Sequence, residues 1–224
     1  EAALVIKSIT NACIGSGCAL LGGETAEMPG HYVDNNFDLA GFSVGCVDEK
    51  KILNNENVKI GNVLLGIESS GPHSNGFSLI RKIINDSKAP KNEIKEMVNK
   101  ALVPTILYPS LIMDLIKKFS INSISHITGG GLLENLPRSI PKDLSIEIDT
   151  KSWKMPKIFR WLQDEGNVPQ DEMYRIFNCG IGMVLFVDEK DSSEIRDKIL
   201  EKSYECFEIG KVCKNKSDNP IEFI

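Results

Sequence analysis

The stretch that decides the fold runs Asn62-Val-Leu-Leu-Gly-Ile67 and continues, after one glutamate, as Ser69-Ser-Gly-Pro-His-Ser-Asn-Gly76. Its first six residues form a compact apolar run with the length of a buried strand. Residues 77–84 then place their apolar side chains at helical spacing. The stretch therefore predicts a strand, a loop and a helix in succession, a pattern typical of layered α/β proteins.

The same alternation continues toward the end of the chain. Further strands are predicted at 122–127, 144–148, 183–187 and 205–212, and further helices at 109–119, 132–136, 156–163 and 192–200. We therefore predict an α/β (α+β) layered fold. Two polar stretches, 88–95 and 211–220, predict mobile surface.

The residues before Asn62 have a different organisation. A helix is predicted from Glu1 to about Gly15, followed by strands at 18–21 and 37–47 and a polar linker at 50–59. We place a domain boundary in this linker, which gives the domains 1–56 and 57–224. Because the helix opens without a cap, we expect the chain to be a fragment or to be ordered only from this point.

The composition argues against several classes of protein. The net charge of −5 gives no support for nucleic-acid binding, which favours a basic surface. No apolar run approaches the roughly 18 residues of a membrane span, and the chain shows no leader of the secretory kind. We expect a cytoplasmic protein with neither nucleic acid nor membrane as a partner.

The loop at 69–76 has the composition of an anion site. Between a strand and a helix start, free backbone N–H groups and the helix dipole face a ligand. Ser70, Ser74 and Asn75 add side-chain donors, and His73 is the titratable side chain of this loop. A lone loop histidine is often only a hydrogen-bonded structural residue, but the surrounding hydroxyls and glycines favour a functional role here.

A second glycine-rich segment, His126-Ile-Thr-Gly-Gly-Gly-Leu-Leu-Glu-Asn-Leu-Pro-Arg138, also joins a predicted strand to a helix. Consecutive glycines let the backbone approach a ligand closely and cost chain entropy on ordering, so a plain connector is the weaker explanation. Neither loop fits the Walker or the Gly-x-Gly-x-x-Gly pattern. A nucleotide site here would be of another kind.

A third segment, Gly22-Gly-Glu-Thr-Ala-Glu-Met-Pro-Gly30, places two carboxylates shortly after a predicted strand. Closely spaced carboxylates suit Mg²⁺, which takes oxygen ligands and usually bridges to the phosphates of a nucleotide. A solvated turn with two ordinary surface acids fits the spacing equally well.

A fourth segment, Glu172-Met-Tyr-Arg-Ile-Phe-Asn-Cys-Gly-Ile-Gly-Met183, leads into a predicted strand. Arg175 and Asn178 are candidates to reach a ligand. The large apolar side chains nearby are expected to pack inside the protein, and they are Met173, Tyr174, Phe177, Trp153 and Trp161.

In this order, the four segments resemble the signatures of the phosphoribosylaminoimidazole synthetase (phosphoribosylformylglycinamidine cyclo-ligase) family. The fourth is similar to that family's Glu-Met-Tyr-Arg-Thr-Phe-Asn segment, with Ile176 where threonine is usual. The resemblance runs nearly end to end. Four long motifs in register are far more specific than any one of them.

The resemblance implies a homodimer whose N-terminal ATP-binding domain and C-terminal α/β sandwich enclose an active cleft. The implied reaction converts formylglycinamidine ribonucleotide and ATP, with Mg²⁺, into aminoimidazole ribonucleotide, ADP and phosphate. Phosphorylation turns the formyl amide oxygen into a leaving group, and the amidine nitrogen then attacks to close the ring. Such an enzyme works mainly by positioning and electrostatics.

The resemblance also assigns roles to residues of this chain. Glu24, Thr25 and Glu27 would bind the nucleotide, with Glu24 and Glu27 as metal ligands. The residues that would line the substrate side are Ser70, Gly71, Ser74, Asn75, Thr128, Gly129 and Gly130. His73 is implied as the catalytic group that handles a proton or orients the substrate, and His126 is a weaker candidate.

One departure from the family pattern concerns the nucleotide side. The family's Asp-Gly-Val-Gly-Thr-Lys signature and a strand-rich half-domain are absent, so residues 1–56 are expected to be the remnant of an ATP-binding domain. We expect this chain alone to be inactive. The alternatives are a sibling ATP-dependent synthetase of the same superfamily and a catalytically silent fragment.

Overall fold

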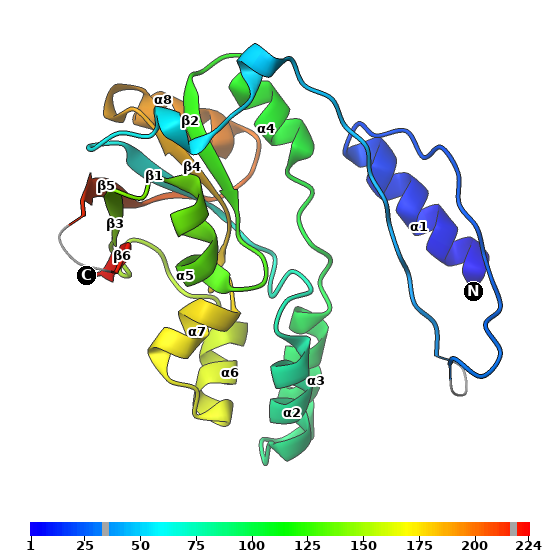
Figure 1. The fold of residues 1–224 in the computed structure, drawn as a ribbon. Coiled ribbons are helices and arrows are strands. Elements are labelled where there is room, and N and C mark those ends of the chain that lie inside the picture. Colours follow the sequence, from blue (N-terminus) through cyan, green and yellow to red (C-terminus); the bar gives the residue numbers. More distant parts are fainter. Residues whose placement is uncertain (33–35, 216–218) are drawn as a thin grey trace. The chain divides into compact units, whose positions relative to one another are not determined.

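The computed structural model describes residues 1–32, 36–215 and 219–224. It divides the chain into two compact units, Glu1–Ile52 and Leu53–Ile224. The division falls inside the polar stretch in which we expected a linker. Each unit is described by itself (Figure 1).

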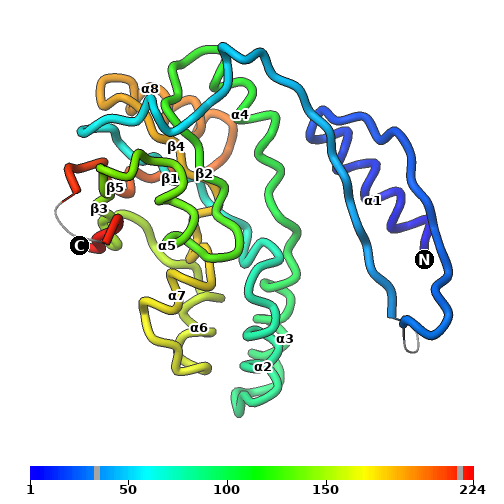
Figure 2. Tube along the Cα trace, in the orientation of Figure 1, coloured from blue at the N-terminus to red at the C-terminus, as the bar shows by residue number. Residues whose placement is uncertain are grey.

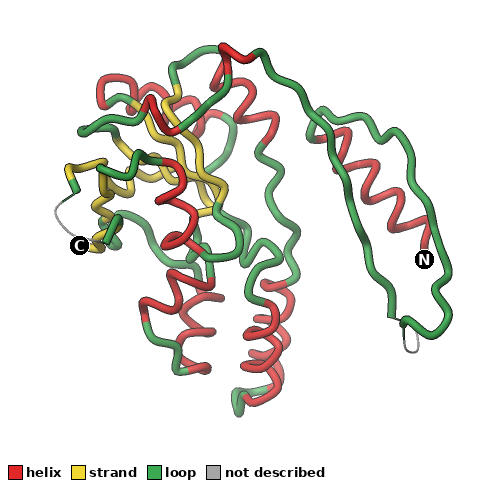
Figure 3. Tube along the Cα trace, in the orientation of Figure 1, coloured by secondary structure: helices red, strands yellow, loops and turns green. Residues whose placement is uncertain are grey.

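The first unit consists of helix α1 (Ala2–Gly15), a 3₁₀ turn at Glu49–Lys51 and irregular chain. The predicted helix is confirmed, but the strands predicted at 18–21 and 37–47 are wrong, since no described residue of this unit is in a strand (Figure 3). A strand forms only when a neighbour pairs with its backbone N–H and C=O groups. Most apolar side chains of this unit are exposed and none of the described ones is buried; Leu21 and Phe42 are 95% exposed each.

The second unit is built on one six-stranded sheet. Its strands are β1 (Val63–Glu68), β2 (Ile121–His126), β3 (Leu144–Ile148), β4 (Ile181–Val187), β5 (Cys206–Lys214) and β6 (Ile221–Phe223). They are ordered β2-β4-β1-β5-β3-β6, and every pair except β3 with β6 is antiparallel. The interior strand β4, which lies between β2 and β1, is buried along its whole length, which explains its uninterrupted apolar sequence.

Helices cover both faces of this sheet. Successive side chains of a strand point to opposite faces of the sheet and so enter two separate cores. Leu64 and Phe186 lie in one core, and Val63 and Leu185 lie in the other. The first core is completed by α2 (Phe77–Asp86), α3 (Lys91–Ala101), α5 (Gly131–Asn135), α6 (Lys157–Gly166) and α7 (Gln170–Ile176). The second is completed by α4 (Pro109–Ile116) and α8 (Glu189–Glu201). The predicted layered α/β fold is confirmed.

Parts of the two stretches predicted as mobile surface lie in regular elements instead. Residues 91–101 form α3, and Met97 within this helix is fully buried. The helix buries one face because its few apolar side chains recur at helical spacing among charged ones. Residues 211–214 belong to β5, and part of the second stretch, 216–218, lies outside the described residues. The core predictions for Met173, Tyr174, Phe177, Trp153 and Trp161 are confirmed. Among the described residues, no helix is long and apolar enough to cross a membrane.

Candidate functional site

The sheet topology brings the two predicted substrate loops to the same edge. Strands β1 and β2 lie on either side of β4, and both are antiparallel to it, so they end at the same side of the sheet. The chain leaves β1 toward α2 and β2 toward α5 there (Figure 2). A Cβ atom at Gly129 would lie 3.8 Å from Asn75 Oδ1. The loops 69–76 and 128–131 are therefore neighbours.

The first loop is held in an uncommon backbone conformation. His73 and Ser74 have successive positive φ angles of 51° and 61°, a region that costs non-glycine residues on the order of 1–3 kcal/mol each. Such strain persists only where the surroundings over-determine it, and it gathers at functional sites. Ser74 is exposed at the turn, and the Asn75 side chain donates to His73 O over 2.8 Å.

His73 lies beneath this loop with its ring buried. Its Nε2 accepts from the backbone N–H of Ser70 at 3.0 Å and of Ile106 at 3.4 Å, and lies 2.9 Å from Ser70 Oγ. Because Nε2 is an acceptor, the proton of the neutral ring is assigned to Nδ1. Burial, with a smaller contribution from nearby His126, lowers the pKa of His73 to about 4. The ring is therefore neutral at physiological pH.

Nδ1 of His73 is a buried donor. Within the described residues it has no hydrogen-bond partner. The space for the ring comes from Gly182 on β4, where a Cβ atom would lie 2.8 Å from the His73 ring. A ring whose acceptor nitrogen is already engaged is better arranged to hold the loop than to exchange protons at that nitrogen.

The Tyr108 ring lies near both histidines of the site. Its ring centroid lies 6.0 Å from that of His73 and 6.0 Å from that of His126. The Tyr108 hydroxyl donates to Glu68 O at 2.6 Å, and burial raises its pKa. His126, the last residue of β2, is exposed, and partial burial of its ring lowers its pKa.

The conformation of the second loop, 128–131, is fixed by a side chain of α5, the helix that follows it. The buried Asn135 side chain donates to Gly131 O at 2.7 Å and to Gly129 O at 3.1 Å. Gly131 has φ 55°, and a Cβ atom there would meet Tyr174 O and lie 2.7 Å from Phe177 O. The loop is thus pressed against the end of α7, and the role of Asn135 was not apparent from the sequence.

The fourth motif supports the loops rather than facing a ligand. Asn178 is 1% exposed, so the prediction that its side chain reaches a ligand is wrong, because its polar atoms are used inside the protein. Arg175 is exposed and forms a 3.4 Å ion pair with Glu172. The Phe177 ring lies directly against Gly76, where the first loop enters α2.

Glu24, Thr25 and Glu27 belong to the first unit, where they are exposed and outside regular secondary structure. In the described parts of the chain, no three His, Cys, Asp or Glu residues are grouped closely enough to hold a metal ion. The nucleotide and metal roles of these residues stay predictions.

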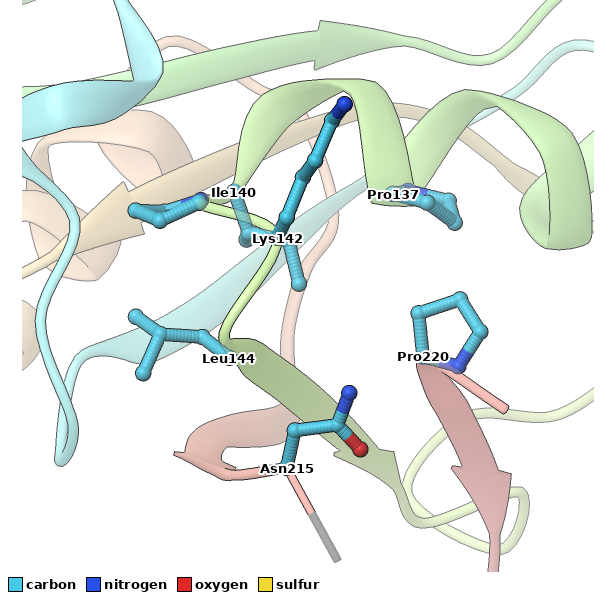
Figure 4. Close-up of a pocket in the computed structure, with 7 residues that line it drawn as sticks. Pro137, Ile140, Lys142, Leu144, Asn215 and Pro220 are labelled. Carbon is cyan, nitrogen blue, oxygen red and sulfur yellow. The ribbon is translucent and has the colours of Figure 1, made fainter. Parts of the chain in front are cut away.

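A shallow hollow elsewhere on the second unit does not coincide with the loops. It has a volume of about 230 Å³, and its lining residues are Pro137, Ile140, Pro141, Lys142, Leu144, Asn215 and Pro220 (Figure 4). Proline and aliphatic side chains dominate this lining, and none of the predicted site residues takes part.

Solved structures share the fold of this chain at low sequence identity. Thiamine-monophosphate kinase from Stenotrophomonas maltophilia superposes with a TM-score of 0.54 at 13% identity, covering 79% of this chain and 54% of that one. For E. coli HypE the TM-score is 0.52 at 14% identity, with 76% and 48% covered. For T. maritima PurL complexed with FGAR it is 0.50 at 10% identity, with 79% and 27% covered.

Curated relatives are far more similar in sequence. A phosphoribosylformylglycinamidine cyclo-ligase from Geobacter metallireducens is 49% identical over 219 residues, covering 95% of this chain and 63% of that protein. A protein of the same name from Neisseria meningitidis serogroup C is 45% identical over 218 residues, with 96% and 63% covered. The chain thus spans a little under two thirds of the length of these relatives.

The family model "AIR synthase related protein, C-terminal domain" matches residues 59–221. The match takes in both loops and almost the entire sheet. This chain therefore belongs to the AIR synthase related protein family.

Proposed function

We propose that this chain is the substrate-side part of an ATP-dependent cyclo-ligase of purine biosynthesis. The complete protein would convert formylglycinamidine ribonucleotide and ATP into aminoimidazole ribonucleotide, ADP and phosphate. The observation that carries the proposal is the pair of adjacent glycine-rich loops, in a chain 45–49% identical to proteins named for this reaction.

The first loop offers the donors that a phosphate-bearing substrate needs. Helix α2 has Gly76 as its N-cap and no side-chain cap, so its first backbone N–H groups are available to an anion. Ser74 and Asn75 stand at this helix start, and Gly129 lies within reach of Asn75. We assign Ser70, Gly71, Ser74, Asn75 and the backbone of 128–130 to the substrate.

His73 orients the substrate loop in this proposal. With Nε2 engaged by the Ser70 amide and the ring neutral, it fixes the turn that presents Ser74 and Asn75. The buried Nδ1–H is a donor for a group that enters the site. Proton transfer is assigned to no residue of this loop.

The nucleotide side is assigned to the first unit. Glu24 and Glu27 supply carboxylate oxygens, the donors that Mg²⁺ prefers, and one or two carboxylates together with nucleotide phosphates are enough to hold this ion. Bound Mg²⁺ would neutralise charge on the transferred phosphoryl group. Thr25 adds a hydroxyl beside them. The proposal also includes a homodimer that works in the cytoplasm without nucleic acid or membrane partners.

Activity measurements test the proposal directly. ADP release and ribonucleotide cyclisation would be followed for the 224-residue chain and for a chimera that places the N-terminal third of the Geobacter metallireducens relative before it. We expect turnover from the chimera and none from the chain alone. An inactive but folded chimera would favour the silent-fragment alternative.

A sibling synthetase is the less favoured alternative. The thiamine-monophosphate kinase structure shares the fold at 13% identity, against 45–49% for the cyclo-ligases. Supplying thiamine monophosphate to the same chimera distinguishes the cyclo-ligase from the sibling enzyme. The proposal requires that ATP be consumed with formylglycinamidine ribonucleotide and not with thiamine monophosphate.

A further inference from the structure

We propose that Asn178 is the positioning residue of the substrate loop. Its buried side-chain amide fixes the backbone of Ser69–Gly71, and through that backbone it sets the place of His73 and of the turn above it. The inference rests on the proposed function for its ligand, although its structural part can be tested without any ligand.

Both ends of the Asn178 amide are used. Oδ1 accepts from Ser69 Oγ at 2.8 Å and from the backbone N–H of Gly180 at 2.9 Å. Nδ2 donates to Gly71 O at 2.8 Å. Because two donors face one end and a carbonyl faces the other, the orientation of the amide is determined by its partners.

The hydrogen bonds of Asn178 fix both neighbours of Ser70, the residue whose amide binds the His73 ring. Asn178 contacts Ser69 and Gly71, the two neighbours of Ser70, and Ser69 N–H additionally donates to Gly180 O at 2.9 Å. The amide of Ser70 is the donor to His73 Nε2. A shift of the 69–71 backbone would therefore break the contact that keeps the His73 ring in place.

The strained backbone at residues 73 and 74 requires contacts such as those made by Asn178. His73 and Ser74 both have positive φ angles, and side chains keep that conformation only when surrounding contacts prescribe it. Asn178 directly follows Phe177, whose ring lies against Gly76 and whose carbonyl lies beside Gly131. The end of α7 is thus a common support for both loops, and Asn178 is its polar contact with the first.

Asn178 itself does not contact the ligand. At 1% exposure its amide has no surface to offer, and its polar atoms already have partners. Its substitution should therefore act through the loop. The isosteric change Asn178→Asp keeps the acceptor for Ser69 but places an oxygen against Gly71 O, where a donor is needed.

The matched control is Asn62→Asp. Asn62 is 4% exposed at the other end of β1, donates to Asp188 Oδ1 at 2.9 Å and accepts from Lys59 N–H at 2.9 Å. Both changes replace the amide nitrogen of a buried asparagine by an oxygen at nearly constant size, and at Asn62 that oxygen faces the Asp188 carboxylate, so this control is at least as disruptive as Asn178→Asp. Both are expected to lower the melting temperature, so only a local readout distinguishes them.

The experiment uses the 224-residue chain without ligand. NMR measures amide hydrogen exchange at Ser70 and the ring ¹⁵N shifts of His73 in wild type, Asn178→Asp and Asn62→Asp. We expect Ser70 exchange about tenfold faster or more in Asn178→Asp alone, as for a lost buried hydrogen bond, with altered His73 ring shifts. Unchanged Ser70 and His73 signals in folded Asn178→Asp, or equal changes in Asn62→Asp, would overturn the proposal.

A second variant covers the possibility that Asn178→Asp does not fold. Ser69→Ala removes only the hydroxyl donor to Oδ1 and should accelerate Ser70 exchange in the same direction by a smaller factor; no acceleration overturns the proposal. Titration with formylglycinamidine ribonucleotide then tests the ligand separately. The wild-type chain contradicts the proposed function if it binds no ribonucleotide. The positioning role is still supported in that case, provided that the variants change Ser70 exchange and the His73 ring shifts as expected.

Discussion

The backbone N–H of Ser70 donates a 3.0 Å hydrogen bond to Nε2 of His73, three residues further along the same loop. This contact makes the histidine an acceptor inside a buried turn. Protonation of Nε2 would place two donors against each other, so the folded loop favours the neutral ring.

The stability of the second unit should therefore depend on pH through His73. The unfolded ring takes up a proton near pH 6.5, whereas the folded ring does so only near the lowered pKa of about 4. Between these values the unfolded state binds more protons, so the free energy of unfolding falls as the pH falls. We expect a loss on the order of 1–3 kcal/mol from pH 7 to pH 4.

Urea unfolding at several pH values measures this loss. His73→Gln should flatten the dependence, while His31→Gln, at an exposed histidine of the first unit, should leave it unchanged. An equally steep dependence in His73→Gln would assign the effect to other groups.

Gly131 should not accept a side chain. Alanine there adopts φ 55° and brings its Cβ against the carbonyl oxygens of Tyr174 and Phe177. The left-handed backbone alone costs about 1–2 kcal/mol, and the overlap adds to it. We expect Gly131→Ala to lose more than about 2 kcal/mol of unfolding free energy in a urea titration.

The matched control lies two residues earlier. A Cβ atom at Gly129 meets only Asn75 Oδ1, at an ordinary 3.8 Å. Gly129→Ala should therefore keep most of the stability while weakening binding of formylglycinamidine ribonucleotide. Equal stability losses in the two variants would contradict the close contact between this loop and α7.

The Tyr108 hydroxyl should contribute measurably to stability. It donates to Glu68 O at the end of β1, and Tyr108→Phe leaves that carbonyl without this donor. We expect a loss of about 0.5–1.5 kcal/mol. Tyr204→Phe, at a partly buried tyrosine packed against the same core, is the comparison, and a thermal melt of both variants decides whether the loss is specific.

The carboxylates of the first unit should control the magnesium requirement of the complete enzyme. In the active chimera, Glu24→Gln combined with Glu27→Gln should raise the Mg²⁺ concentration for half-maximal activity about tenfold or more, because neutral amides are weaker ligands for this ion. Glu49→Gln, another exposed carboxylate of the same unit, is the control. An unchanged Mg²⁺ profile in the double variant would remove these residues from the metal site.

Local sequence patterns determined most elements of the second unit. The alternating residues of Leu144–Ile148 and the continuous apolar run before Val187 predicted β3 and most of β4, because side-chain burial imposes a short period that is visible in the sequence. The glycine-rich loops were also predicted from sequence, since their composition is unsuited to a strand or a helix. Patterns failed at α3, where few apolar residues stand among many charged ones.

Only the tertiary structure decided how these parts form a site. The order β2-β4-β1 places Asn75 beside Gly129, and the packing of α7 buries Asn178 beneath the loop instead of exposing it. Within the loop, the Ser70 amide engages Nε2 of His73, and of the two roles predicted for this residue the contact favours orientation of the substrate over proton handling. These features depend on contacts between residues as much as 109 positions apart, such as Ser69 with Asn178. The sequence by itself determined most strands, helices and loops of the second unit, because side-chain burial leaves a local periodic pattern. Burial and long-range hydrogen bonds, which exist only in the folded chain, decided which loop residues are exposed and which are held inside.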